Sequence, residues 1–576
     1  MPVLDPIAYL PAAKAKEPRL LSLDASMANR HGLVAGATGT GKTVTLHALA
    51  ERLSAAGVTV FLADAKGDLS GLAAPGKTAA EGGNAKIDAA LAAAGLAARE
   101  RTGLPAVFWD VFGEKGHPLR ATVSEMGPLL LGRALGLSET QADVLSLVFR
   151  IADDRGLLLL DLKDLRAVLE FCAKNAAALE PDYGRMAPAS LGAIQRGLVV
   201  LEGEGGSVFF GEPALEIGEL LKKDDRGRGL VHVLAADRLL ESPSLYAAFM
   251  LWILSELFEE LPEAGDLPAP KLVFFFDEAH LLFDGAPPEL VRSVARTVRL
   301  VRSKGVGVWF VTQNPMDLPE EVLAQLGNRV QHALRAYSEK ERRSLKAAAE
   351  SFRPNPRLDA EAVLGELGVG EALVSLLDAE GVPAPVERAR IIPPLSRVGP
   401  LAPRERAAAI AASPFAGRYE ETLDRLSAYE RLRGLGDAPS GAAAGRGGAG
   451  GAGAGARRDG AELGGPAPEA GQAQAGGEDL DAAMAALEAE LRGEAPPEAA
   501  PRYSADYEPR QAPAAAPRQA AAPRRESRAA PVRSEGADFL ESVARSAVRA
   551  AGNEVGRQLV RGLLGGLSGG SRRRRY

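Results

Sequence analysis

The feature that most restricts the fold of this chain is a glycine-rich segment between an apolar run and a helical one. Residues 36–43 read G-A-T-G-T-G-K-T and match the pattern G-x-x-x-x-G-K-[S/T] at every specified position. An apolar run at 33–35 precedes the segment, and 44–54 follow it with helical character. A strand, a glycine-rich loop and a helix in this order predict a phosphate-binding loop.

Each part of the predicted loop has a chemical task. Glycines let the backbone turn so that several N–H groups point at a phosphate, and the following helix N-terminus adds positive potential. Lys42 is expected to reach the β- and γ-phosphates, and Thr43 to offer its hydroxyl to Mg²⁺. The alternative is a purely structural turn. The residues expected to contact the nucleotide are Gly36, Ala37, Thr38, Gly39, Thr40, Gly41, Lys42, Thr43 and Val44.

The pattern around the loop predicts an α/β fold. Short, nearly continuous apolar runs alternate with helical stretches, which is typical of buried parallel strands joined by crossover helices. The six runs expected to form strands are 32–35, 58–63, 106–110, 230–235, 272–277 and 306–311.

Polar side chains follow two of these predicted strands. The apolar residues 272–276 lead directly into Asp277 and Glu278. Ligands of open α/β sheets bind at the carboxyl ends of the strands, so Asp277 is expected to hold Mg²⁺ and Glu278 to activate water. Thr312 and Gln313 come directly after the run at 306–311, and Gln313 is expected to contact the γ-phosphate or the attacking water. The alternatives are a solvated acidic turn and a turn residue before Pro315.

The composition divides the chain into four parts. We expect a short lead-in at 1–30, an α/β domain at 31–435 with a helical insertion at about 116–228, a low-complexity disordered linker at 436–535, and an amphipathic helix with a basic tail at 536–576. The linker is rich in Ala, Gly, Pro and Arg, and such a segment buries too little apolar surface to offset its ordering entropy.

Charge is distributed unevenly. The chain has a net charge of −7, but its last 76 residues carry 15 Arg and 7 acidic residues, a sum of +8, which leaves −15 for the first 500. A basic tail on an acidic body predicts an acidic partner or surface, or only a solubilising role. The single cysteine, Cys172, is expected to be a buried apolar residue in a reducing compartment. Neither a signal peptide nor a membrane span is expected, so the prediction is a cytoplasmic protein.

Five segments in order resemble the HerA/FtsK superfamily of ring-forming ATPases, and most closely its bacterial YjgR-like, HerA-related members. They read GATGTGKTVTL, LADAKGDLSGL, FFFDEAHLLF, RLVRSKGVGVWFVTQNP and QLGNRVQHALRAYS. The resemblance covers about 1–435, together with the C-terminal helix and arginine run. It implies a RecA-like P-loop NTPase fold with a mostly parallel sheet, ATP and Mg²⁺ as ligands, and a homo-hexamer.

The resemblance also implies roles for single residues. Lys42 and Thr43 match the Walker A pair, Asp277 and Glu278 the Walker B pair, and Gln313 the sensor at a strand end. Such rings also place an arginine of one subunit in the neighbouring site, where its charge stabilises the transferring phosphate. The arginines proposed for this role are Arg299, Arg302, Arg329 and Arg335, each with a surface or structural role as the alternative. Asp64 and Asp68 are expected to border the nucleotide.

Three functions fit these expectations. The first is an ATP-driven motor on double-stranded DNA, similar to a translocase or helicase. The second is a nucleotide-driven scaffold that contacts a protein or an acidic membrane surface through 536–576. The third, a nucleotide-binding module without turnover, is disfavoured by Glu278. The lead-in at 1–30 is shorter than the N-terminal β-barrel of HerA, so the nuclease partner of HerA is not implied.

Overall fold

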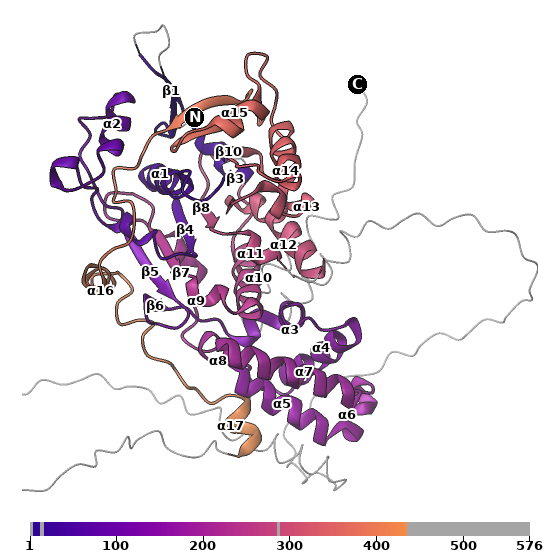
Figure 1. The fold of residues 1–576 in the computed structure, drawn as a ribbon. Coiled ribbons are helices and arrows are strands. Elements are labelled where there is room, and N and C mark those ends of the chain that lie inside the picture. Colours follow the sequence, from indigo (N-terminus) through magenta and orange to yellow (C-terminus); the bar gives the residue numbers. More distant parts are fainter. Residues whose placement is uncertain (1–3, 12–16, 266, 285–287, 435–576) are drawn as a thin grey trace, which may run out of the picture. The chain divides into compact units, whose positions relative to one another are not determined.

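One twelve-stranded sheet organises the part of the chain that the structure describes (Figure 1). The computed structural model describes residues 4–434 except for 12–16, 266 and 285–287. The strand order is β2-β1-β12-β11-β10-β3-β9-β8-β4-β7-β5-β6. From β10 to β6 neighbouring strands are parallel, and from β10 to β2 they are antiparallel. The fold is therefore α/β with a mostly parallel sheet, as the sequence predicts.

All six predicted strands are confirmed, with bounds that differ by at most one residue. The short strands at the sheet margins, β1, β2 and β6, have only two or three residues each and were not predicted. The strands are β1 (Ala8–Leu10), β2 (Arg19–Leu21), β3 (Gly32–Ala35), β4 (Thr59–Asp64), β5 (Ala106–Asp110), β6 (His117–Pro118), β7 (Val231–Ala235), β8 (Leu272–Phe276), β9 (Val306–Thr312), β10 (Asn328–His332), β11 (Glu371–Ser375) and β12 (Glu387–Ile391).

Helices cover both faces of the sheet (Figure 1). The helices are α1 (Lys42–Ala55), α2 (Ala85–Ala93), α3 (Val123–Ala134), α4 (Glu139–Asp154), α5 (Leu162–Lys174), α6 (Ala176–Tyr183), α7 (Pro188–Leu201), α8 (Ser207–Phe209), α9 (Asp237–Leu240), α10 (Pro243–Glu260), α11 (His280–Phe283), α12 (Pro288–Val301), α13 (Glu320–Leu323), α14 (Glu339–Glu350), α15 (Ala360–Glu366), α16 (Pro403–Ala411) and α17 (Ala428–Arg433).

The central strands are buried on both faces, which explains why they read as continuous apolar runs. In β8, Phe274 and Phe276 belong to a core shared with α10, α12 and the helical insertion. The intervening Phe275 belongs to a second core on the other face, together with Leu49 and Leu53 of α1. Alternate side chains of one strand thus serve two cores, and the apolar run fixes the position of β8 inside the sheet.

The helical insertion is present and consists of α3 to α8. Its capping box at Ser138 is confirmed, because the Ser138 N–H donates to Gln141 Oε1 at 3.0 Å. Between β12 and residue 434, where the description ends, the helices are α16 and α17, whereas a longer helical stretch was expected up to about 434. Residues 412–427 form no helix.

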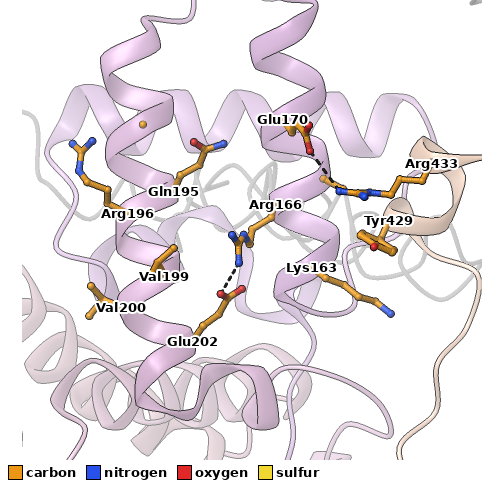
Figure 2. Close-up of a pocket in the computed structure, with 12 residues that line it drawn as sticks. Lys163, Arg166, Glu170, Gln195, Arg196, Val199, Val200, Glu202, Tyr429 and Arg433 are labelled. Carbon is orange, nitrogen blue, oxygen red and sulfur yellow. Dashed lines mark hydrogen bonds and ion pairs between the residues drawn. The ribbon is translucent and has the colours of Figure 1, made fainter.

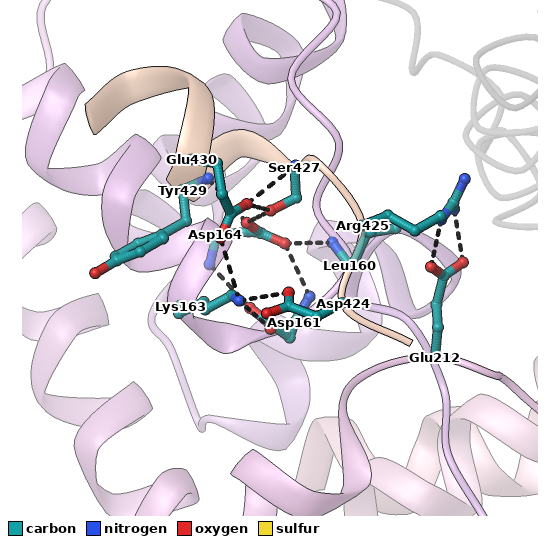
Figure 3. A network of polar contacts seen from close by, with 10 residues as sticks. All are labelled: Leu160, Asp161, Lys163, Asp164, Glu212, Asp424, Arg425, Ser427, Tyr429 and Glu430. Atoms are coloured by element: carbon teal, nitrogen blue, oxygen red, sulfur yellow. Dashed lines mark hydrogen bonds and ion pairs between the residues drawn. The ribbon is translucent and has the colours of Figure 1, made fainter. Parts of the chain in front are cut away.

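A buried carboxylate fixes α17 to the insertion (Figure 3). Asp164 of α5 is fully buried, and it accepts hydrogen bonds from the Ser427 hydroxyl and from the Tyr429 N–H at 2.9 Å. It also accepts the Leu160 N–H at 2.9 Å. The segment from β12 to α17 therefore returns across the molecule and packs on the insertion.

The lead-in predicted at 1–30 takes part in the sheet. Ala8 of β1 pairs with Ile391 of β12, and β2 adds a further antiparallel strand. The predicted linker at 436–535 and the predicted helix at 536–576 lie outside the described residues. Among the described helices, none is both long and apolar enough to cross a membrane.

Candidate nucleotide-binding site

Four neighbouring parallel strands, β3, β9, β8 and β4, end at one edge of the sheet. Their register aligns Ala35 with Thr312 and Phe276 with Ala63. The glycine-rich loop, Gln313, the Asp277–Glu278 pair and the loop at 64–69 therefore emerge next to one another. The predicted assembly of these motifs at the carboxyl edge of the sheet follows directly from the strand order.

The loop between β3 and α1 has the backbone of a phosphate cradle. Gly36, Gly39 and Gly41 have φ angles of +150°, +78° and +119°, values that side-chain-bearing residues rarely adopt. α1 begins at Lys42, directly after the loop. The Lys42 ammonium donates to Gly36 O at 2.6 Å and to Ala37 O at 3.3 Å, so it lies over the loop where phosphate oxygens would bind. Burial lowers the pKa of Lys42, and the nearby carboxylates of Glu278 and Asp277 oppose this shift.

A buried histidine supports the loop from β10. The His332 Nδ1 lies 3.0 Å from Glu371 O, and its Nε2 lies 2.8 Å from the Thr45 hydroxyl. Because a carbonyl oxygen only accepts, Nδ1 carries the proton and Nε2 accepts from Thr45. Burial lowers the pKa of His332 to about 4, so the ring is neutral. A Cβ on Gly36 would lie 2.5 Å from His332 Cβ, which explains the glycine at this position.

The two carboxylates after β8 have different environments. Burial and the adjacent Glu278 raise the pKa of Asp277 to about 7. Glu278 is only 5% exposed, yet hydrogen bonds from Lys66 and Gln313 outweigh the effect of burial and lower its pKa. The Gln313 Nε2 lies 3.3 Å and 3.4 Å from the two Glu278 oxygens, and His280 Nδ1 lies 3.3 Å from Oε2. Glu278 is thus an ionised carboxylate, as a general base requires.

The loop after β4 is built around Asp64. Its buried carboxylate accepts the N–H groups of Gly67 at 2.8 Å, Leu69 at 3.1 Å and Lys66 at 3.3 Å. Burial and the nearby Asp68 raise the pKa of Asp64 to about 6. Asp64 is therefore a structural residue of this edge. Lys66 extends from the same loop to the Glu278 carboxylate, with which it forms an ion pair.

The donor groups at this edge fit a magnesium ion, which prefers oxygen ligands and retains several waters. The Thr43 hydroxyl lies 3.4 Å from Asp68 Oδ2, and the buried Asp68 Oδ1 has no hydrogen-bond partner among the described residues. Thr43 and Asp277 would hold the ion, with Asp68 close to Thr43.

A family model matches nearly the whole chain. The model of the family described as "Helicase HerA-like C-terminal" covers residues 10–457 and 471–574. The chain belongs to this HerA-like family. The predicted membership is therefore confirmed.

Among solved structures, the similar chains include plasmid and conjugative coupling proteins and a VirB4 protein. The bacterial conjugative coupling protein TrwBdeltaN70 is 16% identical, over 66% of this chain and 89% of its own, with a TM-score of 0.42. The plasmid coupling protein TrwB in complex with the ATP analogue ADPNP is 16% identical, over 70% and 97%, with a TM-score of 0.45. VirB4 of Thermoanaerobacter pseudethanolicus is 16% identical, over 70% and 100%, with a TM-score of 0.41. No curated protein matches the chain.

Two of the predicted finger arginines of this HerA-like chain lie at the opposite edge of the sheet. Arg302 precedes β9 and Gln313 follows it, so the seven residues of the strand separate them by roughly 20 Å. Arg299, Arg302 and Arg30 line a cavity of about 790 Å³ at the amino-terminal edge. These arginines are therefore not brought to the phosphate loop of their own subunit.

The other two predicted finger arginines are already engaged with backbone carbonyls. The Arg329 guanidinium donates to Leu326 O and Ser351 O, both at 3.1 Å, and to Leu323 O at 3.3 Å. This set of bonds favours a structural role for Arg329. Arg335 is exposed beyond the end of β10, with one bond to Gly365 O at 3.0 Å.

A cavity of about 830 Å³ is lined by residues of the helical insertion and by Tyr429 and Arg433 of α17 (Figure 2). Its charged side chains are largely paired with one another. Arg166 lies 2.6 Å from Glu202, and Arg433 lies 3.8 Å from Glu170. These pairs satisfy the charges locally, and the chemistry-bearing residues remain those at the strand ends.

Sequence reasoning missed Lys66, Thr45 and His332. All three lie within motifs that carry the family resemblance, but the partner of each lies far away in the sequence. His332 is the last residue of β10, and Lys66 lies two residues after the end of β4. A polar residue just after an apolar strand was the available signal for Lys66, as it was for Asp277 and Gln313. Thr45 lies within α1 and His332 ends a strand that is itself rich in polar residues, so neither carried this signal.

Proposed function

We propose that this chain is an ATP-hydrolysing motor of the HerA type that acts on double-stranded DNA. The observation that supports hydrolysis most strongly is the ionised, buried Glu278, which follows β8. Strand β8 lies next to β9, and β9 lies next to β3, the strand that leads into the phosphate loop. A carboxylate at this place can accept a proton from water that attacks a bound γ-phosphate. Membership of a family described as helicase HerA-like supports the motor activity, and the double-stranded substrate is proposed from the resemblance of the motifs.

Each residue of the edge has a proposed task. The backbone N–H groups of 36–43 cradle the phosphates, and Lys42 places its charge on them. Glu278 orients and deprotonates the attacking water, and Gln313 reports the γ-phosphate to β9 and the rest of the sheet. Magnesium, when bound, neutralises phosphate charge and favours the leaving group. These roles extend the expectations from the sequence.

We also propose a homo-hexameric ring in which Arg299 or Arg302 enters a neighbouring site. Both arginines lie at the amino-terminal edge of the sheet, too far from the phosphate loop of their own subunit. A nucleotide that they contact would therefore be bound to a neighbouring subunit. The test is a mixing experiment. Arg302→Ala and Glu278→Gln chains, each inactive alone, should regain ATP turnover when mixed, because a mixed ring contains some interfaces with both residues intact. If mixed oligomers of the size expected for a hexamer do not regain ATP turnover, the proposed role of Arg302 in a neighbouring site is contradicted.

The central experiment measures ATP turnover with and without double-stranded DNA at about 50 mM salt, where phosphate contacts are strong. Lys42→Ala is the blank, because it removes the charge over the loop. Turnover that DNA stimulates in the native chain and not in the variant supports the motor. Turnover that DNA leaves unchanged favours the second function, a scaffold for a protein or an acidic membrane through 536–576. Turnover equal to the blank contradicts ATP hydrolysis itself.

A further inference from the structure

We propose that Lys66 is a positioning residue for hydrolysis, which holds the Glu278 carboxylate in place from the loop after β4. This inference rests on the proposed function, because it assigns a role in the chemistry of the same site. Lys66 has no place in the Walker motifs, and its ion pair with Glu278 joins segments 212 residues apart in the sequence.

The loop that carries Lys66 is rigidly held at its base. Asp64 accepts three of its backbone N–H groups, including that of Lys66 itself. Gly67 allows the tight turn with a φ of +75°. The Lys66 backbone is therefore fixed relative to β4, whereas its side chain is 45% exposed and spans the distance to Glu278.

Glu278 is held from both sides. β8 lies between β4 and β9, so the segments that follow these two strands flank the residues that follow β8. Lys66 comes from the β4 side and pairs with Oε1. Gln313 comes from the β9 side and contacts both oxygens at 3.3–3.4 Å. The two donors form a clamp, in which the shorter and charged contact is that of Lys66.

Glu278 needs such a clamp for two reasons. Its φ of +47° is unusual for a residue with a side chain, so its backbone does not follow the course of the strand. Its neighbour Asp277 is also a buried carboxylate, and the two negative charges repel one another. Without the ammonium of Lys66, the side-chain contacts left to Glu278 within the described part of the chain would be those with Gln313 and His280, at 3.3–3.4 Å.

Lys66→Met tests the inference, with Lys66→Arg and Lys115→Met as matched variants. Lys115 is a good control, because it is 43% exposed and forms an ion pair with Asp237, at a distance from Glu278 along the sheet edge. We expect Lys66→Met to lower kcat at least 10-fold, with KM for ATP and the affinity for a fluorescent ATP analogue changed less than 3-fold. Lys66→Arg should restore most of the turnover, and Lys115→Met should retain it.

Turnover of Lys66→Met at or above the native rate would overturn the inference. So would a loss of nucleotide affinity without a loss of kcat, since Lys66 would then be a phosphate-binding residue. A second measurement does not depend on turnover. Lys66→Met should clearly lower the urea midpoint of the chain that contains Glu278. The same change should have little effect on the midpoint of the Glu278→Gln variant. If the native chain hydrolyses no ATP but this coupling is found, the proposed function fails while the clamp stands. If the coupling is absent, the clamp fails.

Discussion

The hydrogen bond between Thr45 and His332 offers a direct measure of how the sheet supports the phosphate loop. Both side chains are buried, at 1% and 0% exposure, and their polar atoms lie 2.8 Å apart. Thr45→Val keeps the shape of the side chain and removes the donor. His332→Phe keeps a ring of similar size and removes the acceptor. Each single change leaves a buried polar group unpaired, whereas the double change removes both partners of the bond.

The magnitudes follow from what each variant leaves behind. Thr45→Val leaves His332 Nε2 without a donor, which costs about 1–3 kcal/mol of the free energy of unfolding. His332→Phe leaves Glu371 O without its donor, at a similar cost of about 1–3 kcal/mol. The Thr45 hydroxyl can still donate to Gly41 O at 3.3 Å. In the double variant the unpaired nitrogen is gone, so we expect its cost to fall short of the sum by about 1–2 kcal/mol.

Urea unfolding followed by tryptophan fluorescence suits this cycle. The chain has three tryptophans, and Trp109, Trp252 and Trp309 are all fully buried in the described fold. The four proteins should unfold with equal slopes and different midpoints. Strictly additive effects of the two changes would refute the reasoning, because they would mean that the bond adds nothing to the stability of the loop.

Three further outcomes are expected. Asp164→Ala should lower the free energy of unfolding by about 3–5 kcal/mol, because four donors lose a buried carboxylate acceptor; protease cleavage near α17 should also accelerate, and an unchanged cleavage pattern would contradict the role of Asp164. Burial lowers the pKa of His232 to about 3. The unfolded chain therefore binds a proton at this histidine below pH 6.5, while the folded chain does not. This difference should lower the free energy of unfolding by about 2 kcal/mol at pH 5 relative to pH 7.5. His232→Gln should reduce the loss of stability over this pH range by that amount, and an identical loss would count against a neutral buried His232. Burial raises the pKa of Cys172 to about 12, so iodoacetamide should label it only with unfolding; rapid labelling in native buffer would be inconsistent with this position.

The central strands could be predicted because their chemistry is local. Strands such as β8 and β9 are buried on both faces, so nearly all their residues lack polar side chains, Thr312 at the end of β9 excepted, and the run is visible without a partner. The phosphate loop was equally visible, because its glycines and Lys42 are contiguous. The margins of the sheet could not be predicted. β1 has three residues, and its place depends on pairing with β12, more than 370 positions away.

The same limit applies to the candidate site. Asp277 and Glu278 follow an apolar run and were found, whereas Lys66 is one charged residue in a polar loop. Its significance depends on β4 lying next to β8, which the order of segments along the chain does not reveal. Likewise, nothing local distinguishes Arg329, which holds three carbonyls, from an arginine that is free to enter a neighbouring site.

The charges at the strand ends explain why the site has two lysines. Asp64, Asp68, Asp277 and Glu278 place four carboxyl groups at one edge, and Lys42 is already held by the loop carbonyls. Without a second cation, two neighbouring buried carboxylates could not both remain charged near neutral pH. Burial shifts the pKa of Asp277 to about 7, whereas Glu278 beside Lys66 has a lowered pKa. The adjacent carboxyl groups of Asp277 and Glu278 therefore have different charges near neutral pH and can serve different roles. Asp277 is left for a divalent cation, whose charge would lower its pKa, and Glu278 is kept ionised by the protein itself.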